Sequence, residues 1–343
     1  MNRKLLAAPA VLLAGMMLLG GCANSASPDA NGPADDDGLS IAFFSPVATN
    51  TYTAANLRGV EAAAEELGGT VTMFDAAFDS TTQVGQIQDA LTKGGYDIFV
   101  INPLNPAALV PVATQAIDQG VQVVSLMTTI GTDLTTLQSS VDGLITVGVN
   151  LPTMGTEIGE LMVEACGDTD PCKVAYMPGD AAQATDQLRT AAVKEALAKA
   201  ASVELVSEQP GGFDQAAGLA TTQNILTANP DLNVISAASG QPIAGALQAI
   251  EQAGRTGEVI VVSNGGTEED IEGIRDGAVF AAPLALPFTE GYEGIMLAVA
   301  AMNGETVETA VDVRENSPIG PIATRETLGT DAGKSFTAEW TAG

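Results

Sequence analysis

Short apolar runs alternate with amphipathic stretches of helical period from about residue 39 onward. Such runs are typical of strands buried on both faces of a parallel sheet, and the stretches between them are typical of helices that cover the sheet. In the first part of the chain we expect strands over 39–45, 70–74, 96–101 and 121–126, and helices over 53–67, 81–93 and 106–119. This order is that of a doubly wound α/β lobe.

A second series of alternating elements begins after residue 147. The helices are expected over 152–165, 184–200, 214–227 and 242–253, and the strands over 173–177, 204–208, 234–237 and 258–263. A helix over 268–276, a strand over 279–284 and a helix over 288–302 come last, so the far end of the chain is expected to complete one lobe. The sequence therefore predicts two doubly wound α/β lobes with parallel sheets.

The loops that follow the carboxyl ends of these strands are the places to look for a binding site, because open parallel sheets bind their ligands there. These loops cover 45–52, 102–105, 127–129, 178–189, 239–241 and 264–267. Two such sheet edges facing each other would form a cleft with hinge segments at its base.

The first residues have the build of an export signal. Arg3 and Lys4 precede an apolar run over 5–19, which is too short for a comfortable membrane span. The run leads into the sequence LGGC, which is similar to a bacterial lipobox, so we expect a signal peptide over 1–21 and a lipid on Cys22. The lipid would hold the protein at the outer face of the cell membrane.

Two alternatives remain open for the segment behind the signal. Ordinary cleavage near 23–26 would leave a freely soluble protein, whereas lipid attachment would make residues 22–38 a tether. The tether is rich in Ser, Pro, Asn, Asp and Gly, and such a composition cannot bury enough surface to fold alone. About 305 residues remain after it, which is enough for two domains with separate cores.

Composition narrows the classes of function. The chain has 42 acidic and 13 basic residues and a net charge of −29, which opposes binding to nucleic acid or anionic lipid. It has no histidine, and it lacks the Gly-x-Ser-x-Gly, P-loop and dinucleotide-binding glycine motifs. We therefore expect a binding protein, not an enzyme, with neither a metal nor a cofactor. No second apolar stretch in the sequence reaches spanning length.

Two cysteines remain once Cys22 is assigned to lipid. Cys166 and Cys172 are six positions apart across a turn that contains Gly and Pro, so they can approach to disulfide distance. A metal site would need further ligands, and the chain offers no histidine for one. We expect a disulfide that joins a helix end to a strand.

Several motifs, in their order along both lobes, resemble those of the ribose/galactose-type periplasmic binding proteins, the sugar-binding branch of the type I ABC solute receptors. The motifs are Ser45 with 50–52, Asn102 before Pro103, Arg189, and the stretches 209–214, 223–231 and 245–247. The resemblance implies two Rossmann-like lobes joined by a three-segment hinge. It places 39–147 with 286–311 in one lobe and 148–285 with 312–328 in the other.

The resemblance also implies partners and a role. A monomer of this kind traps a small sugar-like solute and presents it to the permease subunits of an ABC importer. A sensor that presents its bound form to a membrane receptor is an alternative that the sequence leaves open. Transcriptional repressor cores share this fold, but the export signal and the acidic charge argue against a repressor function. The tail 329–343, which holds the only tryptophan, either wraps back onto a lobe or has no order.

Five positions match residues with which the family binds its ligands. The resemblance gives Asn50 and Asn102 hydrogen bonds to ligand hydroxyls, Tyr52 and Phe213 the faces of the ligand ring, and Arg189 a rigid fork of donors. Each of three also has a purely structural interpretation. Asn102 can be a turn residue before proline, and Phe213 can be a core residue at a helix start. Arg189 can be a charged residue on the solvated face of a helix.

Other expected contacts depart from the family pattern. Where charged residues are usual, this chain has Met127 and Thr128, Ser239 and Gln241, or Asn264 and Gly265. Ser45, the last residue of the first expected strand, and Asn150, in the first expected crossing segment between the lobes, complete the expected ligand-binding set. A cleft with so few charged groups favours a ligand with fewer hydroxyls, because a buried polar group rejects ligands that leave it unpaired. We therefore expect a deoxy-sugar, a small polyol or a partly apolar metabolite.

Overall fold

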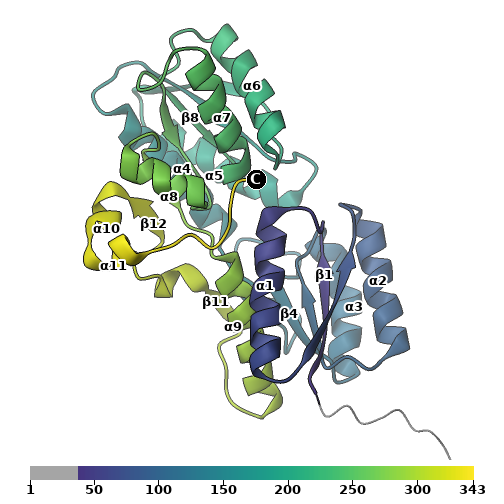
Figure 1. Ribbon diagram of the computed structural model, residues 1–343. Coiled ribbons are helices and arrows are strands. Elements are labelled where there is room, and N and C mark those ends of the chain that lie inside the picture. Colours follow the sequence, from purple (N-terminus) through teal and green to yellow (C-terminus); the bar gives the residue numbers. More distant parts are fainter. Residues whose placement is uncertain (1–37) are drawn as a thin grey trace, which may run out of the picture. The chain divides into compact units, whose positions relative to one another are not determined.

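The computed structural model describes residues 38–343, which form a single unit by their contacts (Figure 1). The expected signal peptide, Cys22 and nearly all of the tether lie outside the described residues. Within the described part, no helix combines the length and the apolar character needed to cross a membrane.

The N-terminal lobe is built on a six-stranded sheet in the order β11-β5-β4-β3-β1-β2. All of its strand pairs are parallel. The strands are β1 (Ser40–Ser45), β2 (Thr70–Asp75), β3 (Ile98–Ile101), β4 (Gln122–Met127), β5 (Ile145–Gly148) and β11 (Ala310–Asp312). The helices are α1 (Thr51–Glu66), α2 (Ser80–Lys93), α3 (Pro106–Asp118) and α9 (Pro287–Met302).

Alternating side chains of the inner strands β1, β3, β4 and β5 pack into cores on both faces of this sheet, whereas the edge strands β2 and β11 are half-buried or exposed. In β1, Ile41 and Phe43 pack with α1 and α9 in one core, whereas Ala42 and Phe44 pack with α2 and α3 in another. The continuous apolar runs of the sequence follow from this, because a strand with helices on both faces has no solvated side. Figure 1 shows α1 and α2 on opposite sides of the strands.

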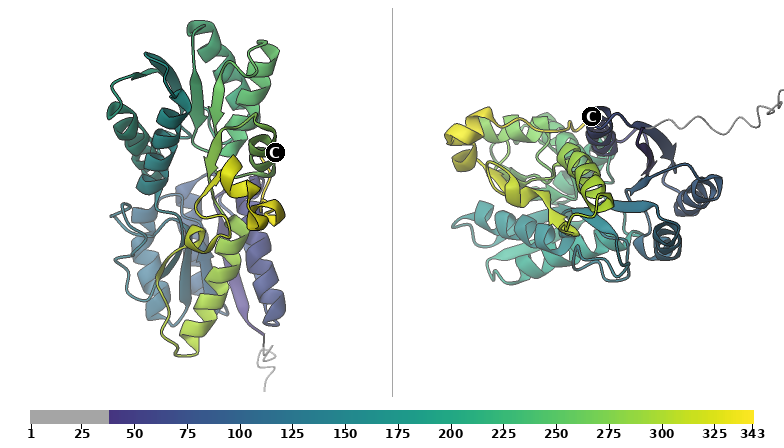
Figure 2. Two further views of the ribbon diagram at one scale, coloured as in Figure 1. Left: turned by 90° about the vertical axis from the view of Figure 1, so that its left-hand side faces the viewer. Right: turned by 90° about the horizontal axis from the view of Figure 1, so that it is seen from below.

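The C-terminal lobe repeats the design with a four-stranded parallel sheet in the order β7-β6-β8-β9. The strands are β6 (Cys172–Met177), β7 (Val203–Glu208), β8 (Val234–Ala237) and β9 (Ile260–Val262). The helices are α4 (Leu151–Cys166), α5 (Ala184–Ala198), α6 (Gln215–Ala228) and α7 (Gly240–Gln252). One core joins the sheet to α4 and α5 and the other joins it to α6 and α7, which stand on opposite sides of the strands in Figure 2.

A short antiparallel ribbon extends this second sheet. It consists of β10 (Ala281–Pro283) and β12 (Ile322–Thr324). The Phe280 N–H donates to the Val261 carbonyl and the Ser263 N–H to the Ala281 carbonyl, at 2.8 and 2.9 Å, so the ribbon continues from the edge strand β9. The remaining elements are α8 (Glu268–Asp276), η1 (Val313–Asn316), α10 (Arg325–Gly329) and α11 (Asp331–Ser335).

The expected fold class is confirmed: the chain crosses between the two lobes three times, after β5, before α9 and after β11. Three short strands differ from the sequence prediction. β5, β11 and β12 were not expected as strands; β11 and β12 are three-residue, partly buried runs that carry no periodic signal. The expected strand over 279–284 shortens to β10 and pairs antiparallel with β12.

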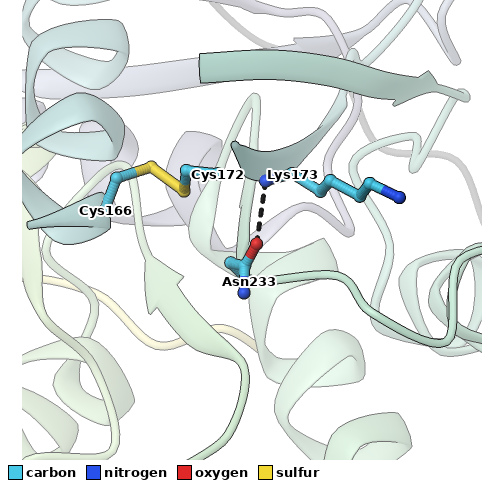
Figure 3. The surroundings of a disulfide bond; sticks show 4 residues. All are labelled: Cys166, Cys172, Lys173 and Asn233. Atoms are coloured by element: carbon cyan, nitrogen blue, oxygen red, sulfur yellow. Dashed lines mark hydrogen bonds between the residues drawn. A yellow bond between two sulfur atoms is a disulfide. The ribbon is translucent and has the colours of Figure 1, made fainter. Parts of the chain in front are cut away.

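A disulfide closes the turn between α4 and β6 (Figure 3). Cys166 ends the helix and Cys172 begins the strand, with 5.8 Å between their Cα atoms. Beside it, the Lys173 N–H donates to Asn233 Oδ1 at 2.8 Å, which ties the start of β6 to the loop before β8. The bond therefore lies at the amino end of the sheet, away from the strand ends where ligands bind.

Replacing both cysteines by alanine is expected to lower the free energy of unfolding by about 2 kcal/mol, because so short a loop constrains the unfolded chain only modestly. The stability falls because the unfolded chain gains conformational freedom. The folded state is unchanged, so solute affinity should not change. Thermal unfolding of the double variant and of the reduced wild type measures the effect. Equal melting temperatures with and without the bond would contradict the prediction.

Candidate functional site

A cavity of about 120 Å³ lies at the carboxyl ends of strands from both lobes. Its volume is close to the roughly 150 Å³ of an engineered cavity that holds benzene, so it suits one small ring and not a chain of sugars. The predicted site residues that line it are Asn50, Tyr52, Asn102, Met127, Arg189, Phe213, Ser239, Gln241, Asn264 and Gly265.

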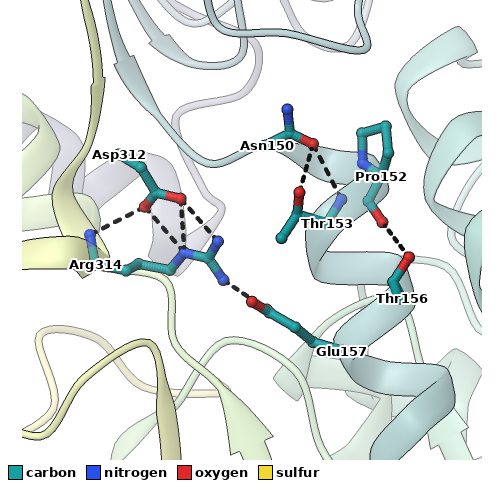
Figure 4. A network of polar contacts seen from close by, with 7 residues as sticks. All are labelled: Asn150, Pro152, Thr153, Thr156, Glu157, Asp312 and Arg314. Carbon is teal, nitrogen blue, oxygen red and sulfur yellow. Dashed lines mark hydrogen bonds and ion pairs between the residues drawn. The ribbon is translucent and has the colours of Figure 1, made fainter.

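Three residues of the expected ligand-binding set do not line this cavity. Ser45 is buried at the end of β1, and Thr128 is buried behind β4, where its carbonyl accepts from Ser125 Oγ at 2.6 Å. Asn150 caps α4: its Oδ1 accepts from the Thr153 N–H and hydroxyl, each at 3.0 Å (Figure 4). The Asn150 side chain is occupied as a helix cap, whereas the Ser45 hydroxyl has no hydrogen-bond partner among the described residues. None of the three lines the cavity, so a ligand contact through any of them stays a prediction.

The start of α1 brings Asn50 and Tyr52 to the cavity. Asn50 is the N-cap, and its Oδ1 accepts from the Tyr52 N–H at 2.9 Å and the Thr53 N–H at 3.4 Å. A capping asparagine in this position satisfies otherwise unpaired N–H groups of the first turn. Its Oδ1 is thus occupied, and the amide nitrogen is the group with which Asn50 can bind a ligand.

A buried chain of hydrogen bonds fixes Asn102 and Tyr52. Asn102 Nδ2 donates to Asn56 Oδ1 at 3.0 Å, and Asn56 Nδ2 donates to Glu290 Oε2 at 3.0 Å. The Tyr52 hydroxyl donates to the same carboxyl group, at 2.9 and 2.8 Å from its two oxygens. With its nitrogen held by Asn56, Asn102 presents its Oδ1 as an acceptor for a ligand hydroxyl.

Glu290 is the buried end of this chain. It is 0% exposed, and burial raises the pKa of its carboxyl to about 8. Burial, and then the nearby Glu290, also raise the pKa of Tyr52 well above its usual value, so the phenol stays a neutral donor. Glu290 was not predicted as part of the site, since a single glutamate within an apolar helix gives no distinguishing signal.

Among the described residues that line the cavity, the only charged side chain comes from the C-terminal lobe. Arg189 of α5 pairs with Asp186, three residues earlier on the helix, and both are buried. Among the described residues, no carboxylate lines the cavity, although the chain has 42 acidic residues. Because the Arg189 charge is balanced within its own helix, the cavity suits an uncharged ligand.

Phe213 faces the cavity from the loop before α6. Its ring lies against Gly179, where an added Cβ would come within 2.3 Å of the ring, so the glycine makes room for the aromatic side chain. On the neighbouring strand ends, Asn264 Nδ2 donates to the Ala238 carbonyl, and Ser239 donates to Gln241 Oε1. These amides are held in place beside the apolar side chains of the lining.

One wall of the cavity comes from the C-terminal tail, for which the sequence did not decide between packing on a lobe and lack of order. Trp340 lines the cavity and is 4% exposed. Apart from its being the only tryptophan, nothing in the local sequence predicts that Trp340 lines the cavity. In the described part of the chain, no group of His, Cys, Asp and Glu side chains has the arrangement of a metal site.

The crossing segments carry a separate polar cluster (Figure 4). Arg314, which follows β11, donates to Asp312 of β11 and to Glu157 of α4, each at 2.8 Å. The guanidinium is 2% exposed and the carboxylates are 15–16% exposed. Burial raises the pKa of Glu157, and the Arg314 charge counteracts that rise. The ion pairs therefore connect the end of one sheet to a helix of the other lobe.

In a comparison with known protein families, residues 41–306 match the family described as periplasmic binding protein domain. The ribose import binding protein RbsB of Salmonella typhimurium is 27% identical over 297 residues, covering 86% of this chain and 95% of that protein.

Solved structures show the same fold. An ABC transporter periplasmic solute-binding protein from Actinobacillus succinogenes with bound D-allose matches with a TM-score of 0.74 and 22% identity, over 87% of this chain and 100% of that one. A solute-binding protein from Mycobacterium smegmatis with bound glycerol matches with a TM-score of 0.73 and 24% identity, over 89% and 100%. At these identities the likeness concerns the fold alone.

Proposed function

The chain belongs to the periplasmic binding protein family, and from that premise we propose that it captures a small sugar-like or polyol-like solute for an ABC importer. Members of this family are binding proteins without enzymatic activity, and so is this chain. The observation that carries the proposal is a monosaccharide-sized cavity with aromatic and amide side chains from both lobes.

The chemistry of the lining narrows the solute class. Met127, Tyr52 and Phe213 give apolar surface, whereas the polar groups are mainly amides and hydroxyls. An amide both donates and accepts, which suits a hydroxyl, and aromatic faces suit C–H groups. A deoxy-sugar or small polyol, neutral and partly apolar, fits this lining better than a ligand with a hydroxyl at every carbon.

Capture would work by hinge closure. Asn102 belongs to the N-terminal lobe and Arg189 to the C-terminal lobe, so one solute satisfies both only when the lobes approach. Binding then shifts the balance between open and closed states by the difference in affinity. The closed form would dock on a permease, with the protein held at the outer face of the membrane by a lipid on Cys22.

A panel of solutes tests the chemical class. D-fucose, L-rhamnose, 2-deoxy-D-ribose, glycerol and myo-inositol are compared with D-ribose and D-glucose by shifts of the melting temperature, since a ligand that binds only the folded state raises it. We expect the largest shift from a deoxy-sugar or polyol. Stabilisation by D-ribose or D-glucose alone would overturn the proposed class, and no shift with any solute would contradict sugar or polyol capture.

The double variant Asn102→Ala/Arg189→Lys is expected to weaken the affinity for the best solute of the panel about 100-fold, because one hydrogen bond is lost in each lobe. Lysine keeps the charge beside Asp186, so the helix is not left with an unpaired buried carboxylate. Titration calorimetry measures the affinity. Ser45→Ala, which alters a buried side chain outside the cavity, serves as the control and should bind as the wild type does. Unchanged affinity in the double variant would exclude this cavity as the site.

A further inference from the structure

The last seven residues, 337–343, form a segment without helix or strand, with a bend at 339, that follows α11 and ends beside the start of α1 (Figure 1). We call this segment the strap. It contacts the N-terminal lobe through alternate residues. Thr51 Oγ1 donates to the Thr341 carbonyl at 2.7 Å, and Arg58 donates to the Glu339 carbonyl at 2.8 Å. The Glu339 carboxylate also accepts from the Thr289 N–H at 3.0 Å.

The residues between these contact the C-terminal lobe. The Glu268 N–H donates to the Trp340 carbonyl at 2.9 Å, and the Ala342 N–H donates to the Glu269 carboxylate at 2.7 Å. Three of these contacts are made by backbone carbonyls of the strap. The strap therefore hydrogen-bonds the N-terminal lobe with residues 339 and 341 and the C-terminal lobe with residues 340 and 342.

Trp340 stands where the strap meets the cavity. Its indole N–H donates to the Gly265 carbonyl at 3.0 Å, and its ring meets Tyr52 edge to face with centroids 5.3 Å apart. Gly265 has a φ of +119°, and an added Cβ there would come within 2.4 Å of the indole. The turn after β9 is therefore shaped around the tryptophan, which is built into the site and does not merely lie over it.

We propose that the strap joins the two lobes beside the cavity and supplies Trp340 as a wall that determines which solute binds. The inference rests on the proposed function, since it assigns a further contact to the same site. The indole completes an aromatic surface with Tyr52 and Phe213, against which the C–H face of a deoxy-sugar can pack. Because the strap is hydrogen-bonded to each lobe, it would also be involved in the movement of the lobes during capture.

The solute arm of the test uses the same panel. Trp340→Ala is expected to weaken the affinity for the best solute about tenfold, whereas Trp340→Phe, which keeps an aromatic face, should restore most of it. The loss should be larger for D-fucose, which carries a methyl group, than for glycerol. If Trp340→Ala binds the panel as tightly as the wild type does, the wall is excluded while the proposed function stands.

The second arm needs no solute, because Trp340 is the only tryptophan and its fluorescence reports on the strap alone. Glu339→Ala removes the acceptor of Thr289, and acrylamide quenching of Trp340 should rise about twofold or more as the strap opens locally. Glu326→Ala, an exposed carboxylate on α10, is the matched control and should leave quenching unchanged. Equal quenching in Glu339→Ala and the wild type would contradict the proposal that the strap joins the two lobes. This result can be obtained even if no solute of the panel binds.

Discussion

Arg314→Met is expected to lower the free energy of unfolding by about 3 kcal/mol. The change removes the cation between Glu157 and Asp312 and leaves two mostly buried carboxylates without a positive partner, although the N–H of residue 314 still donates to Asp312 Oδ1. Breaking a buried pair from one side costs about 3–5 kcal/mol, and the partial exposure of both carboxylates places the value at the lower end. Denaturant unfolding of the full chain measures the loss.

The pH dependence of this loss separates charge from packing. Burial raises the pKa of Glu157 and the Arg314 charge counteracts that rise, so without Arg314 the protonated form of Glu157 is favoured further and the loss should shrink as the pH falls toward 4. Lys199→Met, which breaks an exposed pair with Glu195, is the control and should change stability by less than about 1 kcal/mol. A loss at Arg314→Met that is the same at every pH would contradict the role of the charges.

Glu290 is expected to make the folded protein less stable as the pH rises from about 5 to 8. The pKa of its carboxyl is raised from 4.5 to about 8 by burial. Between these values the unfolded chain releases the proton while the folded chain retains it, so stability is fully present below pH 4.5 and is lost as the pH rises through 8. The full effect is on the order of 3–5 kcal/mol.

Glu290→Gln isolates this contribution. Glutamine keeps a neutral hydrogen-bonding group for Tyr52 and Asn56, so the variant should lose the pH dependence that Glu290 causes and should exceed the wild type in stability above pH 8. Free energies of unfolding at several pH values provide the measurement, with Glu195→Gln as an exposed control. Parallel pH profiles for Glu290→Gln and the wild type would show that Glu290 is ionised in the folded state.

The fold class was predictable because burial on both faces leaves a strong mark on the sequence. Ile41–Phe44 in β1 and Val234–Ala237 in β8 are almost entirely apolar, and each is followed by a helix of recognisable period. β11 is a three-residue, half-buried strand, which sets no such pattern. Its place at the sheet edge is fixed by parallel pairing with β5, a contact distant in sequence.

The site was predictable where local order and family resemblance coincide. Asn102 directly follows a strand, so its place at the sheet edge could be inferred. Asn150 also follows a strand, but the helix start uses its side chain as a cap. Trp340 meets Gly265 across 75 positions and Glu290 meets Tyr52 across 238, and no local pattern connects such pairs. Tertiary packing alone brings them to the cavity.

A crystal structure of the protein grown with the solute that gives the largest melting shift tests the shared cavity most directly. We predict one solute molecule between Asn102 of the N-terminal lobe and Arg189 of the C-terminal lobe, with the indole of Trp340 against its apolar face. A solute bound to one lobe alone, or outside this cavity, would contradict the account.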